Sequence, residues 1–161
     1  MAYAIRPFEA RDAAAIAALT LAAIRVTALR AYSAQQVTAW SARYSMQNLL
    51  DGAAKGDAVL VATDAGDNPV AYTVLEMDGH LDMLFCHPDH TGHGLGERLL
   101  IEAEVTARSL GLTRITTEAS ELARPVFQRA GYALLHRRDF AIGPEDAPVA
   151  IHNYAMEKHL D

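Results

Sequence analysis

Residues 80–111 narrow the choice of fold more than any other part of the chain. The run HLDMLFC is apolar and aromatic, as a buried strand requires, and the loop HPDHTGHG after it contains Pro88 and two glycines, which exclude a continuous helix there. In GLGERLLIEAEVTARSLG the apolar residues then return at helical spacing up to Gly111, a suitable helix end. The apolar face of this helix comprises Leu95, Leu99, Leu100, Ala103 and Ala107.

The loop could bind a metal ion or an anion. It contains three histidines, His87, His90 and His93. The prolines and glycines prevent the helix that would align the imidazoles, and the chain has no HExxH pair or cysteine cluster. A loop rich in glycine at a helix N-terminus can instead turn its main-chain N–H groups towards a phosphate or pyrophosphate. We therefore expect an anion site without metal, built on Gly92, Gly94 and Gly96.

The other segments predict alternating strands and helices in one α/β chain. Strand patterns cover residues 3–9, 58–63, 70–77, 80–87, 113–119, 132–142 and 149–158. Helical patterns cover residues 13–30, 33–44, 46–56, 95–110 and 121–131. Asp12 is expected to cap the first helix, and Ser33 with Gln36 has the spacing of a capping box.

Composition limits the class of protein. A chain of 161 residues that is 51% hydrophobic can form one domain with one core. Its net charge of -6 disfavours nucleic acid, and no run of about 18 apolar residues predicts a membrane span. The N-terminus lacks a secretion signal, and Cys86, the one cysteine, cannot form an internal disulfide. We expect a cytoplasmic protein.

Two segments resemble a known family. LDMLFCHPDHTGHGLGERLL resembles motif A of the GNAT superfamily of acyl-CoA-dependent N-acyltransferases, whose Gln/Arg-x-x-Gly-x-Gly/Ala loop wraps the pyrophosphate of coenzyme A. ASELARPVFQRAGY resembles motif B, and the resemblance extends over residues 3–158. It implies a single domain, residues 1–161, of α/β (α+β) class. The sheet would be mixed, mostly antiparallel, of about seven strands and splayed at its centre, with helices on both faces and acetyl-CoA as co-substrate.

The resemblance also implies which residues bind the cofactor. Backbone groups of one strand would bind the pantetheine arm: Leu84, Phe85 and Cys86. Main-chain N–H groups of the loop would bind the pyrophosphate: Thr91, Gly92, His93, Gly94, Leu95, Gly96 and Glu97. In motif B, Ser120 would contact the arm and Arg129 the phosphates.

The chain departs from the family pattern at two positions. Thr91 replaces Gln or Arg, which removes a side-chain donor and leaves the backbone donors. Phe127 replaces a tyrosine that often protonates the departing thiolate, so another acid such as Tyr154, or solvent, must act.

A primary amine with a pKa of about 10.4 must lose a proton before it can attack. The candidate bases are Glu76, His80 and Asp82. We favour Asp82, because a carboxylate within an apolar strand should have a raised pKa; the alternative is an edge residue that faces water. Glu76 and His80 flank a turn and are expected to be solvated. Strand alternation would place His80, Asp82 and Leu84 on one face and Leu81, Met83 and Phe85 on the other.

The acceptor is expected to be a small-molecule or peptide amine. Tyr32 and Trp40 could offer it an aromatic surface, although we favour helix-packing core as the role of Trp40. Cys86 is expected to be a small hydrophobic residue and not a nucleophile. Nucleic acid and membrane are not expected as partners, and the resemblance is compatible with a homodimer. Two hypotheses remain open: an acetyltransferase that works by direct attack in a ternary complex, and a non-catalytic acyl-CoA-binding or sensor module.

Overall fold

The strands form one mixed sheet in the order β1-β2-β3-β4-β5-β7-β6 in the computed structural model, which describes residues 2–161. They span Ala4–Pro7 (β1), Ala58–Thr63 (β2), Pro69–Leu75 (β3), His80–Cys86 (β4), Arg114–Ala119 (β5), Ala133–Ile142 (β6) and Val149–His159 (β7). Every neighbouring pair is antiparallel except β4 and β5, which are parallel. The predicted sheet of about seven mostly antiparallel strands is confirmed within residues 2–161.

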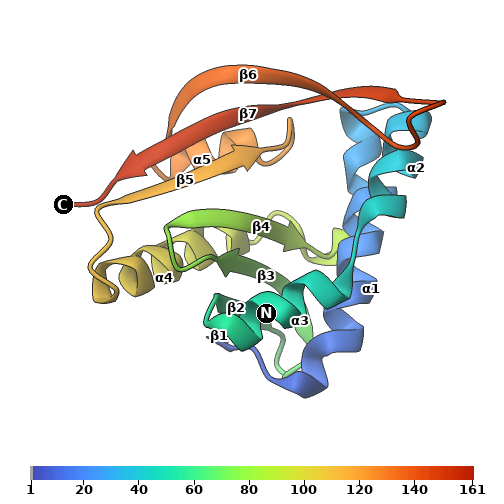
Figure 1. Ribbon diagram of the computed structural model, residues 1–161. Helices are drawn as coiled ribbons and strands as arrows, with labels where there is room; N and C mark the ends of the chain where they lie inside the picture. The colour runs from blue at the N-terminus through green and yellow to red at the C-terminus, as the bar shows by residue number, and fades with distance from the viewer. Residues whose placement is uncertain (1) are drawn as a thin grey trace.

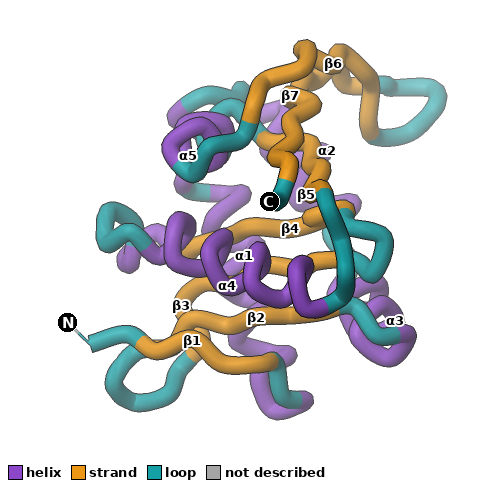
Figure 2. Tube along the Cα trace, turned by 90° about the vertical axis from the view of Figure 1, so that its left-hand side faces the viewer, coloured by secondary structure: helices purple, strands orange, loops and turns teal. Residues whose placement is uncertain are grey.

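Helices cover both faces of the sheet. They span Ala13–Arg25 (α1), Ala34–Arg43 (α2), Met46–Lys55 (α3), Leu95–Ser109 (α4) and Arg124–Arg129 (α5). Figure 2 shows α4 in front of β2–β4 and α1 behind them. The predicted apolar face of α4 is fully buried, and Leu100 packs against Leu81 of β4. On the opposite face Ile16 of α1 and Leu49 of α3 pack against Tyr72 of β3.

The first helix differs from the prediction at both ends. Asp12 occupies the N-cap position of α1, but its side chain makes no capping hydrogen bond. The carboxylate instead accepts two hydrogen bonds from Arg6, at 2.8 and 2.9 Å, and one from the Glu9 amide at 2.8 Å. A buried carboxylate requires such a charged partner, so Asp12 ties β1 to the start of α1. The helix ends at Arg25 and not near Arg30, where a 3-10 turn follows.

Residues Ala10–Arg30 are also long and apolar enough to cross a membrane, with a mean hydropathy of 1.6. In the fold this segment is a core helix with its flanking turns. Ile16 and Leu19 are buried against the sheet, and the hydroxyl of Thr20 lies 2.7 Å from that of Tyr72. Core packing therefore accounts for part of its apolar composition, since 39% of its most apolar 18-residue window is buried.

The strands β4 and β5 separate soon after they meet. They pair only at His80 with Thr116 and at Leu81 with Thr117, and Figure 1 shows them diverging towards their C-terminal ends. Beyond Leu81 the edge of β4 that faces β5 therefore has no neighbouring strand. The predicted splay of the sheet is confirmed, and it lies where the glycine-rich loop begins.

A β-bulge changes the direction of side chains along β4. Leu75 of β3 is opposite Leu81, whereas Val74 is opposite Met83, so Asp82 is the extra residue. Leu81 packs with the α4 side of the core, as does Leu84, while Met83 and Phe85 pack against the α1 side. The predicted alternation, with Leu81 on the same face as Met83 and Phe85, is therefore wrong, because one extra residue inverts the phase of the strand.

Two threonine hydroxyls satisfy carbonyl groups around the bulge. Thr117 donates to the carbonyl of Leu81 at 2.8 Å, and Thr73 donates to the carbonyl of Met83 at 2.7 Å. Both threonines are buried, so each hydroxyl needs a partner. These bonds hold the backbone on both sides of Asp82, next to the point where β4 and β5 separate.

Candidate active site

Two hollows meet where the sheet splays. One, of about 390 Å³, is lined by the glycine-rich loop and is called the loop hollow. The other, of about 620 Å³, reaches to the β6–β7 hairpin and is called the hairpin hollow. They share the lining residues Trp40, Leu84, Phe85, Ser120 and Ala123. A molecule in the loop hollow can therefore meet a molecule in the hairpin hollow beside the free edge of β4.

Main-chain N–H groups are the free hydrogen-bond donors at the end of the loop hollow formed by the glycine-rich loop. Gly92 and Gly94 have φ angles of 82° and 72°, and a Cβ atom at either position would meet nothing within 4 Å. Gly94 is the N-cap of α4 and supplies no side-chain cap, so the N–H groups of the first helical turn remain available. A Cβ at Gly96 would lie 2.9 Å from a methyl of Val126, so glycine allows α5 to approach. Free amides at the positive end of a helix suit a phosphate or pyrophosphate.

The side chains of the loop add little positive charge. Thr91 donates its hydroxyl to the Pro88 carbonyl at 3.1 Å. His93 does not line the hollow, and its ring lies 5.6 Å from that of Tyr3. Arg129 lines the hollow but binds Glu97, with contacts of 2.8 and 2.7 Å. An anion held here would depend mainly on the backbone, because the Arg129 charge is already shared with Glu97.

The remaining predicted cofactor residues, except Phe127, line the loop hollow. Leu84, Phe85 and Cys86 line it from β4, and Ser120 lines both hollows. Phe127 lies on the hairpin side, is buried and packs edge-on against Tyr132 at 5.0 Å. Burial raises the pKa of Cys86 to about 11, so its thiol is protonated near neutral pH and is a poor nucleophile, as expected.

Asp82 is an exposed residue of β4, as the alternative of an edge residue that faces water requires, and its carboxylate also lines the hairpin hollow. It makes no hydrogen bond to another residue of the described chain, 2–161, and it lines the hollow. Partial removal from water raises the pKa of Asp82, and the neighbouring charge of Glu76 raises it further. A carboxylate that is unpaired and more basic than usual can accept a proton from a bound amine.

Glu76 and His80 form an ion-paired set with Glu118 instead of standing free in solvent as expected. Nδ1 of His80 lies 2.9 Å from Glu76, and Nε2 lies 2.6 Å from Glu118. Burial acts to lower the pKa of His80, but the two carboxylates outweigh it and raise the pKa overall. His80 is therefore held towards the imidazolium form, which cannot act as a base.

One group of side chains has ligand atoms close enough to suggest a metal: those of Glu76, His80 and Asp82 lie within 4.8 Å of one another. Both nitrogens of His80 are already bonded to carboxylates, and a protonated imidazole cannot coordinate a metal. The loop histidines His87, His90 and His93 do not form such a group in the described part of the chain. The absence of a metal stays a prediction.

Tyr154 and Tyr32 take part in a hydrogen-bond network around Glu121. The hydroxyl of Tyr154 donates to Glu121 at 2.8 Å, and Nε2 of His152 lies 2.6 Å from the same oxygen. Tyr32 donates to the His152 carbonyl at 3.0 Å and accepts from the Glu121 amide at 2.8 Å. Arg124 pairs with Glu121 at 2.9 Å.

This network bears on the roles predicted for both tyrosines, Tyr154 as the acid and Tyr32 as a surface for the acceptor. Tyr154 lines neither hollow in the described structure, and its bond to Glu121 raises its pKa, so the geometry does not favour it as the acid. Tyr32 is buried and borders the hairpin hollow, where its hydroxyl is already used. Trp40 lines both hollows and lies 6.3 Å from Phe85, centroid to centroid. Sequence reasoning missed Glu121, because nothing in its spacing from His152 indicates the contact.

Glu121→Gln should lower the stability of the fold. At neutral pH we expect a loss of about 1–3 kcal/mol in the free energy of unfolding, because three partners lose a charged acceptor. The bond from His152, first of all, lowers the pKa of Glu121. The contribution of Glu121 to the free energy of unfolding is therefore complete above the ordinary pKa of a glutamate. It is lost as the pH falls through the lowered pKa of Glu121 in the folded protein. Denaturant unfolding at neutral and acid pH measures both effects.

The matched control is Glu145→Gln, which removes the same charge from an exposed hairpin residue. It should leave the unfolding midpoint unchanged. If both variants were equally stable at neutral pH, the Glu121 network would not support the fold.

Comparisons with known proteins agree with this geometry. Residues 28–143 match the family model described as "Acetyltransferase (GNAT) domain". A GCN5-related N-acetyltransferase from Rhodopseudomonas palustris, whose description also carries the words "Aminotransferase, Class-II", is 31% identical. The similarity covers 99% of this chain and 97% of that one, with a TM-score of 0.85.

Two further relatives are similar over most of their length. The Escherichia coli (strain K12) protein YafP, described as an uncharacterized N-acetyltransferase, is 29% identical over 131 residues, which is 80% of this chain and 79% of that one. PaiA N-acetyltransferase from Thermoplasma acidophilum, solved in complex with coenzyme A, is 18% identical with a TM-score of 0.78, and 99% of each chain is covered. At that identity, the last comparison concerns the fold alone.

Proposed function

Because this chain belongs to the GNAT family of acetyltransferases, we propose that it transfers an acetyl group from acetyl-CoA to a primary amine by direct attack in a ternary complex. The loop hollow holds the cofactor, and the hairpin hollow holds the acceptor. The amine can be part of a small molecule or a peptide.

The observation that carries the proposal is the junction of the two hollows at the splay of β4 and β5. The glycine-rich loop offers unpaired amides for a pyrophosphate at one end of the loop hollow. The free edge of β4 at Leu84, Phe85 and Cys86 leads from that loop towards Asp82. An extended pantetheine arm has amide groups that can bond such an edge as an added strand would.

The reaction then needs one base and tolerates the absence of an acid. Acetyl-CoA supplies an activated acyl group as a thioester. The bound ammonium group first gives one proton to Asp82. The neutral amine nitrogen then attacks the thioester carbon, the carbon–sulfur bond breaks, and the nitrogen loses its second proton to water. Phe127 has no proton to give, so the thiolate takes one from water; general acid catalysis contributes about 10²–10⁴-fold, and its loss slows turnover without preventing it.

Two measurements on the purified chain test this function. Calorimetric titration with acetyl-CoA should show binding, and free-thiol release over a broad panel of amines should depend on the acceptor. Binding of acetyl-CoA without any acceptor-dependent thiol would favour a non-catalytic sensor. No binding of any coenzyme A species would contradict both.

A further inference from the structure

We propose, as an extension of the proposed function, that the acceptor carries an anionic group in addition to its amine, and that Arg43 binds this group at the mouth of the hairpin hollow. The ligand class is an amine with a carboxylate or phosphate several bonds from the nitrogen. Asp82 and its acidic neighbours would face the nitrogen, and Arg43 would face the anion.

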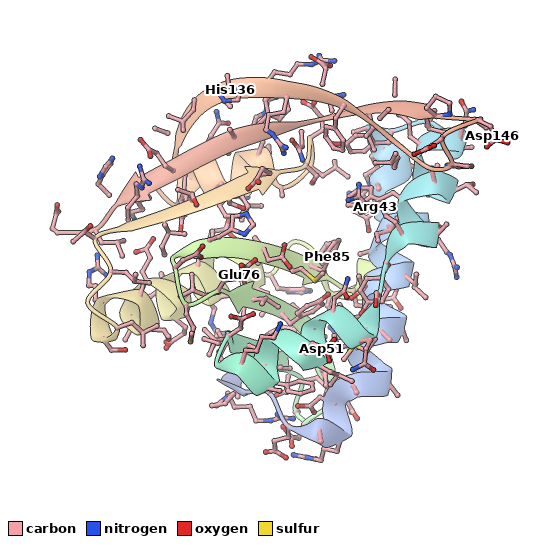
Figure 3. The ribbon with its side chains drawn as sticks, in the orientation of Figure 1. Arg43, Asp51, Glu76, Phe85, His136 and Asp146 are labelled. Carbon is pink, nitrogen blue, oxygen red and sulfur yellow. The ribbon has the colours of Figure 1, made fainter. Side chains whose placement is uncertain are left out.

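The first evidence is the separation of charge along the hairpin hollow. Asp82 and Glu118 line one part of it, with Glu76 beside them. These three carboxylates outnumber the two positive charges among them, His80 and Arg138, so this part retains a negative charge that attracts a cation. Arg43, at the end of α2, lines another part together with Asn48. Figure 3 shows Arg43 and Glu76 towards opposite ends of the opening, with Phe85 between them. A ligand with both charges fits this arrangement better than a simple amine does.

The second evidence is that Arg43 has no acidic partner, unlike the other arginine of this hollow. Arg138 donates to Asn153 at 3.1 Å, lies 3.9 Å from Glu118 and stacks over the ring of Phe140. Arg43 makes no ion pair or side-chain hydrogen bond within residues 2–161 and is exposed. Its guanidinium therefore keeps its donors for a ligand, and its fork matches a carboxylate or phosphate.

The third line of evidence is the distance between Arg43, which follows Trp40 on α2, and the candidate base Asp82. It lies three residues after Trp40 on α2, which puts the two side chains on neighbouring turns of one face. Trp40 borders both hollows and lies 6.3 Å from Phe85. From Asp82 to Phe85 the strand advances by roughly 10 Å. The anion and the amine should therefore be separated by several bonds, as in an ω-amino acid or a short peptide.

The test uses acceptors that differ only in the anionic group. A series of ω-amino carboxylates of increasing length is compared with the corresponding amides and with plain alkylamines, by thiol release from acetyl-CoA. Aminoalkyl phosphates form a separate arm, to distinguish a phosphate from a carboxylate. We expect kcat/KM to be at least tenfold higher for one anionic acceptor than for its uncharged amide, mainly through a lower KM.

Variants assign the preference to Arg43. Arg43→Gln should reduce the preference for the anion about tenfold, and Arg43→Lys, which keeps the charge, should retain part of it. Arg30→Gln is the control, because Arg30 is exposed and lines neither hollow; the preference should remain.

Two outcomes would overturn the inference and leave the proposed function standing: equal kcat/KM for anionic and uncharged acceptors, or an anion preference that Arg43→Gln leaves intact. If acetyl-CoA binds but no amine releases thiol, the proposed function is contradicted, and the inference about Arg43 is contradicted with it.

Discussion

Gly94→Asp is expected to weaken the binding of acetyl-CoA by about 100-fold or more, as measured by calorimetric titration. Gly94 stands at the N-cap of α4 in a left-handed conformation, and free space lies where a side chain would project. An aspartate there would bring a negative charge to the proposed pyrophosphate site and would repel the anion. The loss of two charge-assisted hydrogen bonds corresponds to about 3–6 kcal/mol.

Two controls separate charge from backbone strain. Gly94→Ala has the same left-handed φ but adds no charge, so it should bind acetyl-CoA more tightly than Gly94→Asp. Gly111→Asp places the same residue at a φ of 76°, also in open space, after the other end of α4. It should keep the parent affinity. If Gly94→Asp bound acetyl-CoA as the parent does, the pyrophosphate could not lie at this loop.

The order of elements and the main features of the loop hollow could be predicted from the sequence. Periodicity reports burial directly, which is why the buried face of α4 agrees residue by residue with the prediction. The capping box of Ser33 and Gln36 is also confirmed, with bonds of 2.9 and 3.1 Å. Glycines before a helix likewise predict free main-chain amides. The capping box and the free amides could be predicted because each depends on local backbone geometry alone.

Features that depend on distant pairing could not be predicted. The bulge at Asp82 depends on the register between β3 and β4, and a single strand does not carry that information. The capping role of Asp12 was wrong because Arg6, from the preceding strand, takes the carboxylate. Glu121, likewise, meets His152 only when β7 lies beside β5.

The bulge also explains why Asp82 lines the hairpin hollow. In a regular strand it would alternate with Leu81 and Met83, and both of these neighbours pack into the core on opposite faces of the sheet. As the extra residue it belongs to neither face and projects where β5 has separated from β4. The same irregularity lies beside the free edge of β4, where we propose that the cofactor arm binds, and it leaves a carboxylate at the end of that edge.

Asp82→Asn is therefore expected to lower kcat/KM for amine acetylation by about 100-fold at neutral pH, the scale of a general base. As a base Asp82 must be unprotonated, so parent activity should fall as the pH drops through the raised pKa of this carboxyl, above the range of an ordinary aspartate. The variant should lack this acid limb. Its deficit should shrink as the pH approaches the pKa of the amine, because the acceptor then arrives already deprotonated.

Thiol release measured across this pH range, with acetyl-CoA affinity measured in parallel, separates a base from a binding residue. Asp82→Glu keeps a carboxylate and should recover part of the activity, whereas Asp51→Asn removes an equal charge from α3 outside both hollows and should change nothing. A pH profile of Asp82→Asn that has the shape of the parent profile would exclude Asp82 as the base. Glu118 would then be the carboxylate to consider, because it lines the same hollow and its bond to His80 occupies only one of its two oxygens.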